Sequence, residues 1–295
     1  MQALSQAVEA APARDPGAGG RPTVLVAGGT GTLGSVLVPR LVQRGLSVRV
    51  LTRKDTGILD GVEVMVGDIR SPADAAEAVR GVRTVVSAVT GFGPTRGQTA
   101  RSVDLEGNRT LFAAAREAGA EHVVLMSVHG AAPDHPIQLY RMKHAAEQEL
   151  RASGLAWTFV RPTAYLETWI RVLCEPLVQK GRTQVFGRGE NPINFVSVQD
   201  VAKIVERAMT DPERRGQAVE AIGPDNLTMS ELVERYRQDP GRGGAVKHVP
   251  RAMMRVASVA LRPFNPAMAE LIAAALVMDT QDMTATAFPG EARRA

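Results

Sequence analysis

A short apolar segment followed by three glycines at three-residue steps limits the folds open to this chain more than any other feature. Residues 23–27 (TVLVA) read as a buried strand, and Gly28, Gly31 and Gly34 follow it directly. Gly28 permits a tight turn, Gly31 lets the backbone approach a phosphate, and Gly34 lets the next helix pack close to the strand. Backbone N–H groups at the start of that helix bind anions well. A tight turn without a ligand is the alternative. The pattern predicts a pyrophosphate site made by Gly28, Thr30, Gly31, Thr32, Leu33 and Gly34.

Strands and helices alternate from residue 23 to residue 161. The β-branched segments predict strands at residues 23–27, 48–52, 62–66, 84–88, 122–126 and 157–161. Helical patterns begin near Leu33, Pro72, Ala100 and Ile137, and Gly119 is suited to cap the third of them. Right-handed crossovers then give an α/β fold with a doubly wound parallel sheet, a Rossmann fold. Its ligand crevice is expected beyond the carboxyl ends of the strands.

Composition and charge exclude several classes of protein. With 44% hydrophobic residues, a chain of 295 residues buries enough surface to form a compact globule. Lys and Arg number 35 against 31 Asp and Glu, and the formal charge of +4 is too small and too evenly spread for a nucleic-acid surface. Cys174 is the single cysteine and has no metal-ligand spacing around it. We therefore expect a cytoplasmic protein with no disulfide and no metal site.

The apolar segment 252–278 is interrupted by Arg262-Pro263 and Asn265-Pro266. Neither half reaches the roughly 18 to 20 apolar residues that cross a bilayer, so no membrane span is expected. The segment predicts two amphipathic helices, for which a lid, a homodimer contact and a membrane-surface role are all open.

The second predicted strand ends in Arg53 and Lys54, about twenty residues after the glycines, where an NAD-selective enzyme carries an acidic residue. The planar guanidinium of Arg53 is suited to a 2′-phosphate, which points to NADPH. A solvated surface arginine is the alternative.

Other residues at strand ends are expected beside the cofactor. Asp68 could accept a hydrogen bond from the adenine amino group, or merely cap the following turn, while Ile69 packs on the ring. A mobile loop at 91–94 contains Phe92, a candidate wall of the substrate pocket. The ribose and nicotinamide side is expected at Ala88, Val89 and Thr90.

After residue 162 the predicted secondary structure changes from alternating strands and helices to longer helices and isolated short strands. Asp200, which precedes an apolar-periodic segment, is expected to N-cap a helix. The predicted organisation is a flexible N-terminal tail at 1–21, an NADP(H)-binding Rossmann domain at 22–162, a smaller mainly helical substrate region that shares the sheet at 163–280, and a C-terminal tail at 281–295.

Several motifs, in this order, carry a family resemblance. They are GGTGTLG from Gly28, LTRKD from Leu51, GDI from Gly67, VDLEGNRTLFAAAREAGAEHVVLMS ending at Ser127, SGLAWTFVRPTAY ending at Tyr165, and FVSVQDVA from Phe195. Together they resemble the NmrA-like group of atypical short-chain dehydrogenases/reductases over about residues 23–236. The resemblance implies a Rossmann fold with a small C-terminal substrate region. It implies NADPH-dependent reduction in some members and redox sensing without catalysis in others. Pro162 and Thr163 are expected to contact the cofactor, and Thr163 and Tyr165 to form a wall of the substrate pocket.

Relatives of this group use Ser, Tyr and Lys, with Tyr and Lys four residues apart on one helix. By this resemblance Ser127 matches the serine, and Lys143 matches the lysine, which acts on the cofactor ribose or as the acid/base. Four residues before Lys143 stands Leu139, and the tyrosine is one position later, at Tyr140. A slip of one residue rotates a helical side chain by about 100°.

The roles of Tyr140 and Lys143 stay open at this point. Tyr140 is a surface or packing residue, a pocket wall, or a proton donor reached through a distorted helix turn. Lys143 could instead be a solvated lysine paired with Glu147 one turn on.

Two further residues near this set depart from a simple pattern. Asp104 stands where relatives with an extended substrate region often have Asn. His129, close to Ser127, could supply a proton to a substrate, or be a structural or surface histidine.

The sequence leads to three hypotheses about function. The first is an NADPH-dependent oxidoreductase that reduces a carbonyl, quinone or enone of a small, neutral substrate, in a pocket that includes Phe92, His129 and Tyr165. The second is a non-catalytic NADP(H)-binding redox sensor, which the displaced tyrosine favours. The third is a nonredox lyase or isomerase that holds NADP(H) tightly.

Overall fold

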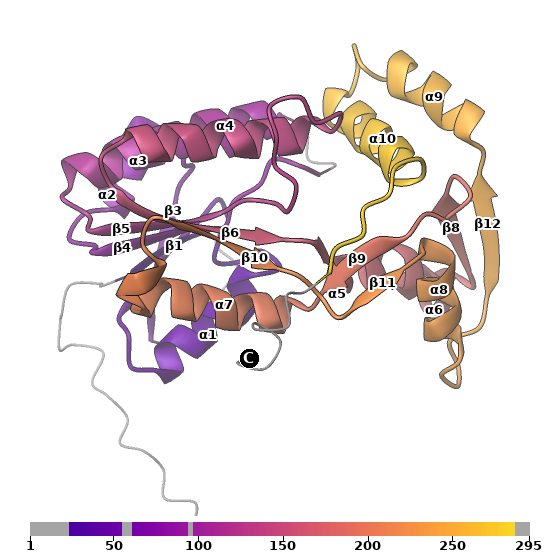
Figure 1. The fold of residues 1–295 in the computed structure, drawn as a ribbon, viewed down its shortest axis with the longest axis horizontal. Helices are drawn as coiled ribbons and strands as arrows, with labels where there is room; N and C mark the ends of the chain where they lie inside the picture. The colour runs from indigo at the N-terminus through magenta and orange to yellow at the C-terminus, as the bar shows by residue number, and fades with distance from the viewer. Residues whose placement is uncertain (1–23, 55–60, 94–96, 287–295) are drawn as a thin grey trace, which may run out of the picture.

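The structure is a computed structural model that describes residues 24–54, 61–93 and 97–286. Thr23, Pro94, the expected tail at 1–21 and residues 287–295 of the expected C-terminal tail lie outside the described residues. Between them the chain forms a large central sheet covered by helices on both faces, with a second cluster of elements beside it (Figure 1).

Seven parallel strands make the central sheet, in the order β10-β6-β5-β4-β1-β2-β3. Strand order reverses between β1 and β4, as in a doubly wound fold, and a ligand crevice opens at such a point. The predicted Rossmann fold is confirmed. The strands are β1 (Val24–Ala27), β2 (Val48–Thr52), β3 (Val62–Val66), β4 (Thr84–Ser87), β5 (His122–Met126), β6 (Ala156–Pro162) and β10 (Gln217–Ala221).

Alternate side chains of β1 enter two separate hydrophobic clusters. Leu25 and Ala27 pack in the cluster under α2 (Pro72–Ala78), α3 (Asn108–Glu117) and α4 (Gln138–Ala152). Val24 and Val26 pack on the opposite face, under α1 (Gly34–Gln43) and α7 (Val198–Thr210). Figure 1 shows these two helical layers on either side of the sheet. Because both faces are covered, the strands read as continuous apolar runs.

The helix predicted from Ala100 differs from a regular α-helix over its first eight residues. Ala100–Gly107 is a π-helical segment, capped at its start by Thr99 and Ser102, and α3 continues from it. Asp104 and Asn108 are both fully buried, and the Asn108 side chain donates a hydrogen bond to the backbone oxygen of Asp104. This side-chain bond satisfies a carbonyl group at the widened turn. Gly119, with a φ of 75°, follows the end of α3 as predicted.

The chain after residue 162 adds β10 and α7 to the central layers and builds two small sheets around a third cluster that includes Leu173 and Phe195. The predicted boundary at residue 162 stays a prediction. The first small sheet contains β7 (Ala164–Tyr165), β9 (Ile193–Val196) and β11 (Asp225–Leu227), and the second pairs β8 (Arg182–Phe186) with β12 (Ala245–Val249). The helices are α5 (Leu166–Trp169), the π-helical Ile170–Cys174, α6 (Glu175–Lys180), the 3-10 turn Pro212–Arg214, α8 (Met229–Arg237), α9 (Arg251–Ala260) and α10 (Pro266–Met278).

The expected N-cap at Asp200 is wrong. Helix α7 begins two residues earlier, at Val198, and its N-cap is Ser197, whose hydroxyl accepts a hydrogen bond from the backbone N–H of Gln199. Asp200 lies inside the first turn and forms an ion pair with Lys203. Serine and aspartate are both favoured N-caps, so residue type alone could not separate the two positions.

Within the described ranges, none of the helices has the length and apolar character that crossing a membrane requires.

Candidate functional site

The glycine-rich turn after β1 has the geometry expected of a close backbone approach. Gly28 has a φ of 86°, and a Cβ added there would lie 2.8 Å from the Ala88 carbonyl oxygen. A Cβ on Gly34 would lie 2.4 Å from the backbone of Gly29, so the start of α1 packs directly on the turn. The N–H of Gly31 closes the turn on the Gly28 oxygen at 3.0 Å. Only glycine fits Gly28 and Gly34 without moving backbone atoms.

One cavity of about 750 Å³ extends from this turn to the second cluster of elements. Its volume is within the range of small-molecule and cofactor sites. Of the predicted site residues, those that line it are Gly28, Thr30, Gly31, Thr32, Leu33, Arg53, Lys54, Asp68, Ile69, Ala88, Val89, Thr90, Phe92, Ser127, Tyr140, Lys143, Pro162, Thr163 and Tyr165. Gly34 lies behind the turn rather than in the lining.

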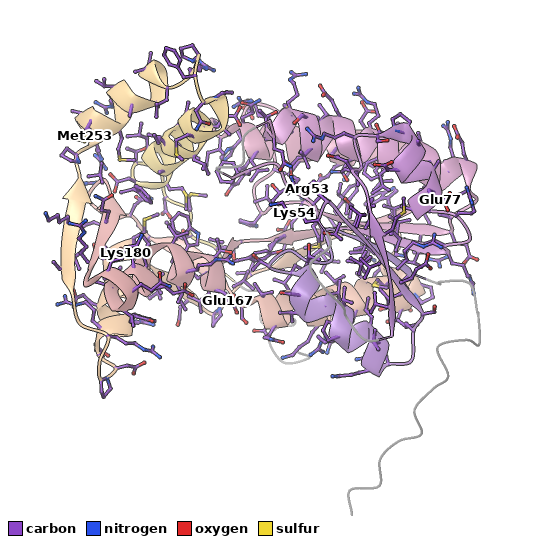
Figure 2. The ribbon with its side chains drawn as sticks, turned by 180° about the vertical axis from the view of Figure 1, so that it is seen from behind. Arg53, Lys54, Glu77, Glu167, Lys180 and Met253 are labelled. Carbon is purple, nitrogen blue, oxygen red and sulfur yellow. The ribbon has the colours of Figure 1, made fainter. Side chains whose placement is uncertain are left out.

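Arg53 and Lys54 stand at one rim of the cavity, at the end of β2 (Figure 2). Both are exposed, and in the described part of the chain neither has a carboxylate at ion-pair distance. Below them the hydroxyls of Thr30 and Thr52 are 3.0 Å apart, which ties the end of β2 to the glycine-rich turn. The rim therefore presents two cations that have no ion-pair partner among the described residues, beside the turn predicted to bind the pyrophosphate.

Asp68 follows β3 and is held by Arg70. Its carboxylate accepts hydrogen bonds from the backbone N–H of Arg70 at 2.9 Å and from the Arg70 guanidinium at 2.6 Å. These bonds hold the pKa of the Asp68 carboxyl below its usual range. Asp68 thus caps the following turn, which is the alternative to a hydrogen bond with the adenine amino group. Ile69 is buried against Gly107, where a Cβ would come within 2.7 Å of the isoleucine side chain.

Lys143 on α4 is buried and ion-paired. Its Nζ lies 2.9 Å from Asp104 Oδ1 and donates a hydrogen bond to the Val89 oxygen at 3.1 Å. The side chains of Lys143 and Asp104 are 5% and 0% exposed, so each charge needs the other. The other oxygen of Asp104 accepts from the N–H of Gly91 at 2.8 Å and from the Thr90 hydroxyl. One carboxylate therefore joins Lys143 to the turn after β4.

The alternative of a solvated Lys143 paired with Glu147 is wrong. Glu147 is fully buried and binds the guanidinium of Arg161 on β6, at 2.6 and 2.8 Å. Arg161 also reaches Glu220 on β10 at 3.4 Å. The spacing of one helical turn does not bring the Lys143 and Glu147 charges together, because Lys143 points to the cavity and Glu147 to β6.

Ser127 directly follows β5 and lines the cavity. Its backbone N–H is bound to the Val160 oxygen at 2.8 Å. Its hydroxyl is buried, and among the described residues it has no hydrogen-bond partner. A buried hydroxyl loses free energy when it is unpaired, so one that lines a cavity is suited to a ligand.

Tyr140 lines the cavity although it stands one residue away from the position that the family pattern expects. Its ring stacks on His135, with centroids 4.0 Å apart. Leu139, at the expected position, lines the same cavity. Burial raises the pKa of the Tyr140 phenol to about 12, so its hydroxyl stays protonated near neutral pH. Tyr140 is half-buried, packs against the third hydrophobic cluster and lines the cavity, so the interpretations as a packing residue and as a pocket wall both fit and that of a surface residue does not.

His129 does not line the cavity, so the expectation that it belongs to the substrate pocket is wrong. Its Nδ1 lies 2.8 Å from a carboxylate oxygen of Glu220. Its backbone N–H is bound to the Pro162 oxygen at 2.9 Å. Because His129 and Glu220 are 91 residues apart, no local pattern could identify this carboxylate partner.

The end of the cavity away from the glycine-rich turn is apolar and aromatic. Burial raises the pKa of Tyr165 in this wall. Thr163 adds a hydroxyl that donates to the Asn194 side chain at 2.8 Å. The described lining also includes the apolar residues Phe92, Ile137, Leu139, Ala164, Trp169, Ala274 and Met278 and the polar residues Gln98 and Thr168.

Arg171 is a lining residue that the sequence analysis did not identify. It belongs to the π-helical segment after α5, yet its guanidinium donates a hydrogen bond to the Thr32 hydroxyl at 3.1 Å and lies 3.4 Å from the Thr168 hydroxyl. Thr32 is part of the glycine-rich turn, 139 residues earlier. A cation from the second half of the chain therefore stands over the predicted pyrophosphate site. Nothing in the sequence around Arg171 could have indicated this.

Comparison with known proteins gives matches that extend over most of the chain. The profile of the NmrA-like family matches residues 21–287. The chain is 31% identical over 223 residues to an NAD(P)H azoreductase of Xenophilus azovorans, and the match covers 74% of each protein. It is 28% identical over 237 residues to the photosystem II assembly factor Ycf39 of Synechocystis sp., covering 79% of this chain and 72% of that protein.

Among solved structures, the fold is similar to that of triphenylmethane reductase from Citrobacter sp. complexed with NADP(H). The TM-score is 0.69, and the match covers 90% of this chain and 92% of that one. Sequence identity is 20%, so this likeness concerns the fold alone.

Proposed function

The chain belongs to the NmrA-like family, and we propose that it is an NADPH-dependent oxidoreductase that reduces a carbonyl, quinone or conjugated alkene of a small, neutral, largely apolar substrate. The observation that carries this proposal is the continuity of one cavity. It joins the glycine-rich turn, the cations at its rim, Ser127 and Lys143 at its middle, and an aromatic wall at its far end. A dinucleotide and an apolar molecule fit such a sequence of surfaces end to end. The azoreductase relative supports the class of reaction.

The residues at the turn fit a dinucleotide. The backbone N–H groups at the start of α1 bind the pyrophosphate, since the close packing at Gly28 and Gly34 leaves no Cβ in the way. Arg171 stands over the same turn from the opposite wall and adds a guanidinium to this site. Arg53 and Lys54, both free of carboxylates within the described ranges, bind the 2′-phosphate and select NADPH over NADH.

When bound, NADPH would supply the hydride and water the proton that completes the reduction, while the chain holds both partners of the reaction and stabilises the charge that develops. Ser127 Oγ donates a hydrogen bond to the substrate atom that becomes negative, because it is the buried hydroxyl left unpaired in the cavity lining that the structure describes. A preorganised donor of this kind lowers the barrier without reorganising at the moment of reaction.

Lys143 acts as a positioning residue in this proposal. An ammonium group has three N–H donors. One of them is bound to the Val89 oxygen and a second faces Asp104, which leaves one for a cofactor ribose hydroxyl. The contacts with Asp104 and Val89 hold the Lys143 ammonium group in place, which favours a positioning role over an acid/base role. Tyr140, whose pKa is raised to about 12, serves as a wall and a hydrogen-bond donor.

A direct test is the loss of NADPH absorbance with a panel of quinones, enones, aldehydes and azo compounds, each at several concentrations. We expect turnover with at least one apolar member and little with charged analogues, because the far wall is apolar. Turnover restricted to anionic substrates would contradict the proposed use of the aromatic end.

Ser127→Ala tests the chemistry separately from cofactor binding. Loss of one preorganised donor lowers kcat by about a hundredfold. The dissociation constant for NADPH, measured by fluorescence titration, should stay within a factor of two of the wild type. Ser153→Ala, at the end of α4, is the matched control because its hydroxyl donates only to the Leu150 oxygen within the described residues. Equal kcat values for both variants would remove Ser127 from the mechanism.

A non-catalytic NADP(H) sensor is the second candidate, and two observations favour it. Leu139 occupies the position of the family tyrosine, and Lys143 is committed to Asp104. A sensor predicts tight binding of NADPH, no turnover with any member of the panel, and a change in protease susceptibility between the NADPH and NADP⁺ complexes.

A further inference from the structure

Helix α9 exposes an apolar face on the outside of the molecule. Met253, Val256 and Val259 follow one another at three-residue steps, which puts them on one side of the helix. They are 61%, 69% and 73% exposed, and Phe264, just after the helix, is 76% exposed. Figure 1 shows α9 at an outer corner of the molecule, and in Figure 2 Met253 lies at its edge. We name Met253, Val256, Val259 and Phe264 the outer stripe.

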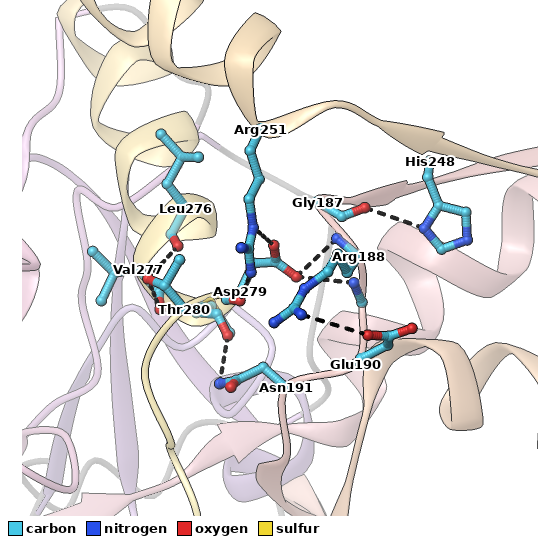
Figure 3. A network of polar contacts seen from close by, with 12 residues as sticks. Gly187, Arg188, Glu190, Asn191, His248, Arg251, Leu276, Val277, Asp279 and Thr280 are labelled. Carbon is cyan, nitrogen blue, oxygen red and sulfur yellow. Dashed lines mark hydrogen bonds and ion pairs between the residues drawn. The ribbon is translucent and has the colours of Figure 1, made fainter.

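The exposure of the outer stripe does not result from a loosely held helix. The opposite side of α9 buries Met254. At its first residue, Arg251 forms an ion pair with Asp279 at the end of α10 (Figure 3). The same carboxylate accepts from the backbone N–H groups of Arg188 and Gly189, at 3.0 and 2.9 Å. One buried carboxylate thus fastens α9 to α10 and to the turn after β8, and α9 presents its apolar side in a fixed direction.

The surroundings of the outer stripe are basic. Residues 240–269 contain five Lys and Arg residues and no Asp or Glu. Arg255 and Arg262 are exposed beside the stripe, and in the described chain neither forms an ion pair with a carboxylate. Lys247, on the preceding strand, is exposed as well. The next acid is Glu270 on α10, whose carboxylate binds the backbone of Ala100.

We infer that the outer stripe and its arginines dock this protein on an anionic lipid surface. A helix with exposed apolar residues on one side and Arg beside them lies in the boundary between headgroups and acyl chains. Arg242 and Arg251 of this segment already pair with Asp239 and Asp279. Phosphate-bearing lipids supply negative charge for the basic residues beside the stripe that have no such pair among the described residues. A second copy of the chain fits less well, because an isologous contact would bring two basic surfaces together. This inference does not depend on the proposed function.

The geometry adds a reason for this surface to be on α9. Helix α10 packs directly behind α9, and its residues Ala274 and Met278 line the apolar end of the cavity. In a docked protein, only α9 and α10 would therefore separate the apolar end of the cavity from the lipid.

The test is flotation of the full chain with vesicles of phosphatidylcholine alone and of phosphatidylcholine mixed with phosphatidylglycerol. We expect binding to the anionic vesicles and at most weak binding to the neutral ones. Binding should weaken between about 0.1 M and about 1 M salt, because the Debye length falls from about 10 Å to about 3 Å.

Two variants separate the apolar and the basic contributions. Val256→Glu with Val259→Glu should lower the partition coefficient at least tenfold, and Arg255→Gln with Arg262→Gln should lower it about 25-fold, at about fivefold for each arginine. All four side chains are exposed, so the thermal unfolding midpoints should stay at the wild-type value. Val178→Glu, on α6 and 56% exposed, is the matched control that leaves binding unchanged.

Three outcomes overturn the inference. The first is no flotation of the wild-type chain with anionic vesicles at low salt. The second is equal flotation of the wild-type chain and the Val256→Glu, Val259→Glu variant. The third is a dimer in sedimentation velocity that this variant converts to a monomer, which would assign the outer stripe to a second copy of the chain.

Discussion

The two ends of the cavity are built in different ways. The dinucleotide end takes its shape from backbone: Gly28 and Gly34 leave no room for a Cβ, and free cations stand at the rim. The apolar end takes its shape from side chains such as Phe92, Tyr165 and Met278, which belong to separate segments of the chain. On the proposed function, the first end recognises its ligand through fixed donors and charge, and the second through fit. We expect substitutions at the first end to have large, specific effects and those at the second to have small, graded ones.

Gly34→Ala should have the largest effect. Alanine favours a helix by about 1 kcal/mol over glycine, so any loss must come from the contact of its Cβ with the Gly29 backbone at 2.4 Å. Moving the turn to relieve this contact costs about 3 kcal/mol or more, which corresponds to a loss of NADPH affinity of about a hundredfold. Calorimetric titration measures the loss of NADPH affinity, and thermal unfolding measures the change in the stability of the fold. Gly243→Ala is the control, because a Cβ there meets nothing within 4 Å.

Arg53→Ala should come next, and it should act on one cofactor only. A charge-assisted hydrogen bond contributes about 1.5 to 3 kcal/mol, so NADPH should bind at least about tenfold more weakly. NADH lacks the 2′-phosphate, and its affinity should stay nearly unchanged. Dissociation constants for the two cofactors, measured side by side, decide the matter. Equal losses for both cofactors would refute the assignment of Arg53 to the 2′-phosphate.

Arg171→Ala sharpens the comparison because this residue joins the two halves of the chain. Its guanidinium is bound to Thr32 at the pyrophosphate turn. We expect NADPH and NADH to weaken by the same factor, about tenfold, since both carry a pyrophosphate. Arg255→Ala on α9 serves as the control for loss of a surface arginine. A loss confined to NADPH, or to the KM of the substrate, would move Arg171 out of the pyrophosphate site.

Tyr140→Phe should have the smallest effect if the apolar end works by fit. Burial raises the pKa of the Tyr140 phenol in the folded protein to about 12, whereas in the unfolded chain it is near 10. Below about pH 10 the phenol is therefore protonated in both states. Its neutral form therefore stabilises the fold fully below pH 10, and this contribution is lost as the pH rises toward 12. Activity should show no tyrosine titration between about pH 6 and about pH 9. A fall in kcat of more than about a hundredfold in Tyr140→Phe would make the hydroxyl a proton donor instead.

Most of the sheet and the glycine-rich turn could be predicted because their signals are local. A β-branched run forms a strand wherever both faces are covered, and Gly34 must be glycine because a Cβ there would meet the backbone of Gly29 and Gly28, five and six residues earlier. The same local reading failed at Asp200, since Ser197 three residues earlier competes for the same cap. Where one short segment contains all the atoms involved, the sequence is informative.

The rest of the site depends on pairs that the sequence does not connect. Asp104 reaches Lys143 from a π-helical segment whose widened turn no hydrophobic period reveals. Arg171 meets Thr32 across 139 residues, and its contact depends on how the second half of the chain packs on the first. The helical spacing from Lys143 to Glu147 suggested an ion pair, but the buried charge of Arg161 outcompetes it. These contacts follow from tertiary packing, which local patterns do not encode.

The position of α10 near the end of the described chain has a consequence for synthesis. The six strands before residue 162 leave the ribosome early, whereas Met278 follows more than a hundred residues later. At about 5 to 20 residues per second, the nascent chain spends several seconds with its first six strands made but with α7, β10 and the aromatic wall still incomplete. A ligand that binds the early half stabilises it by mass action during this interval. The availability of nucleotide during translation therefore bears on how much of the protein escapes aggregation.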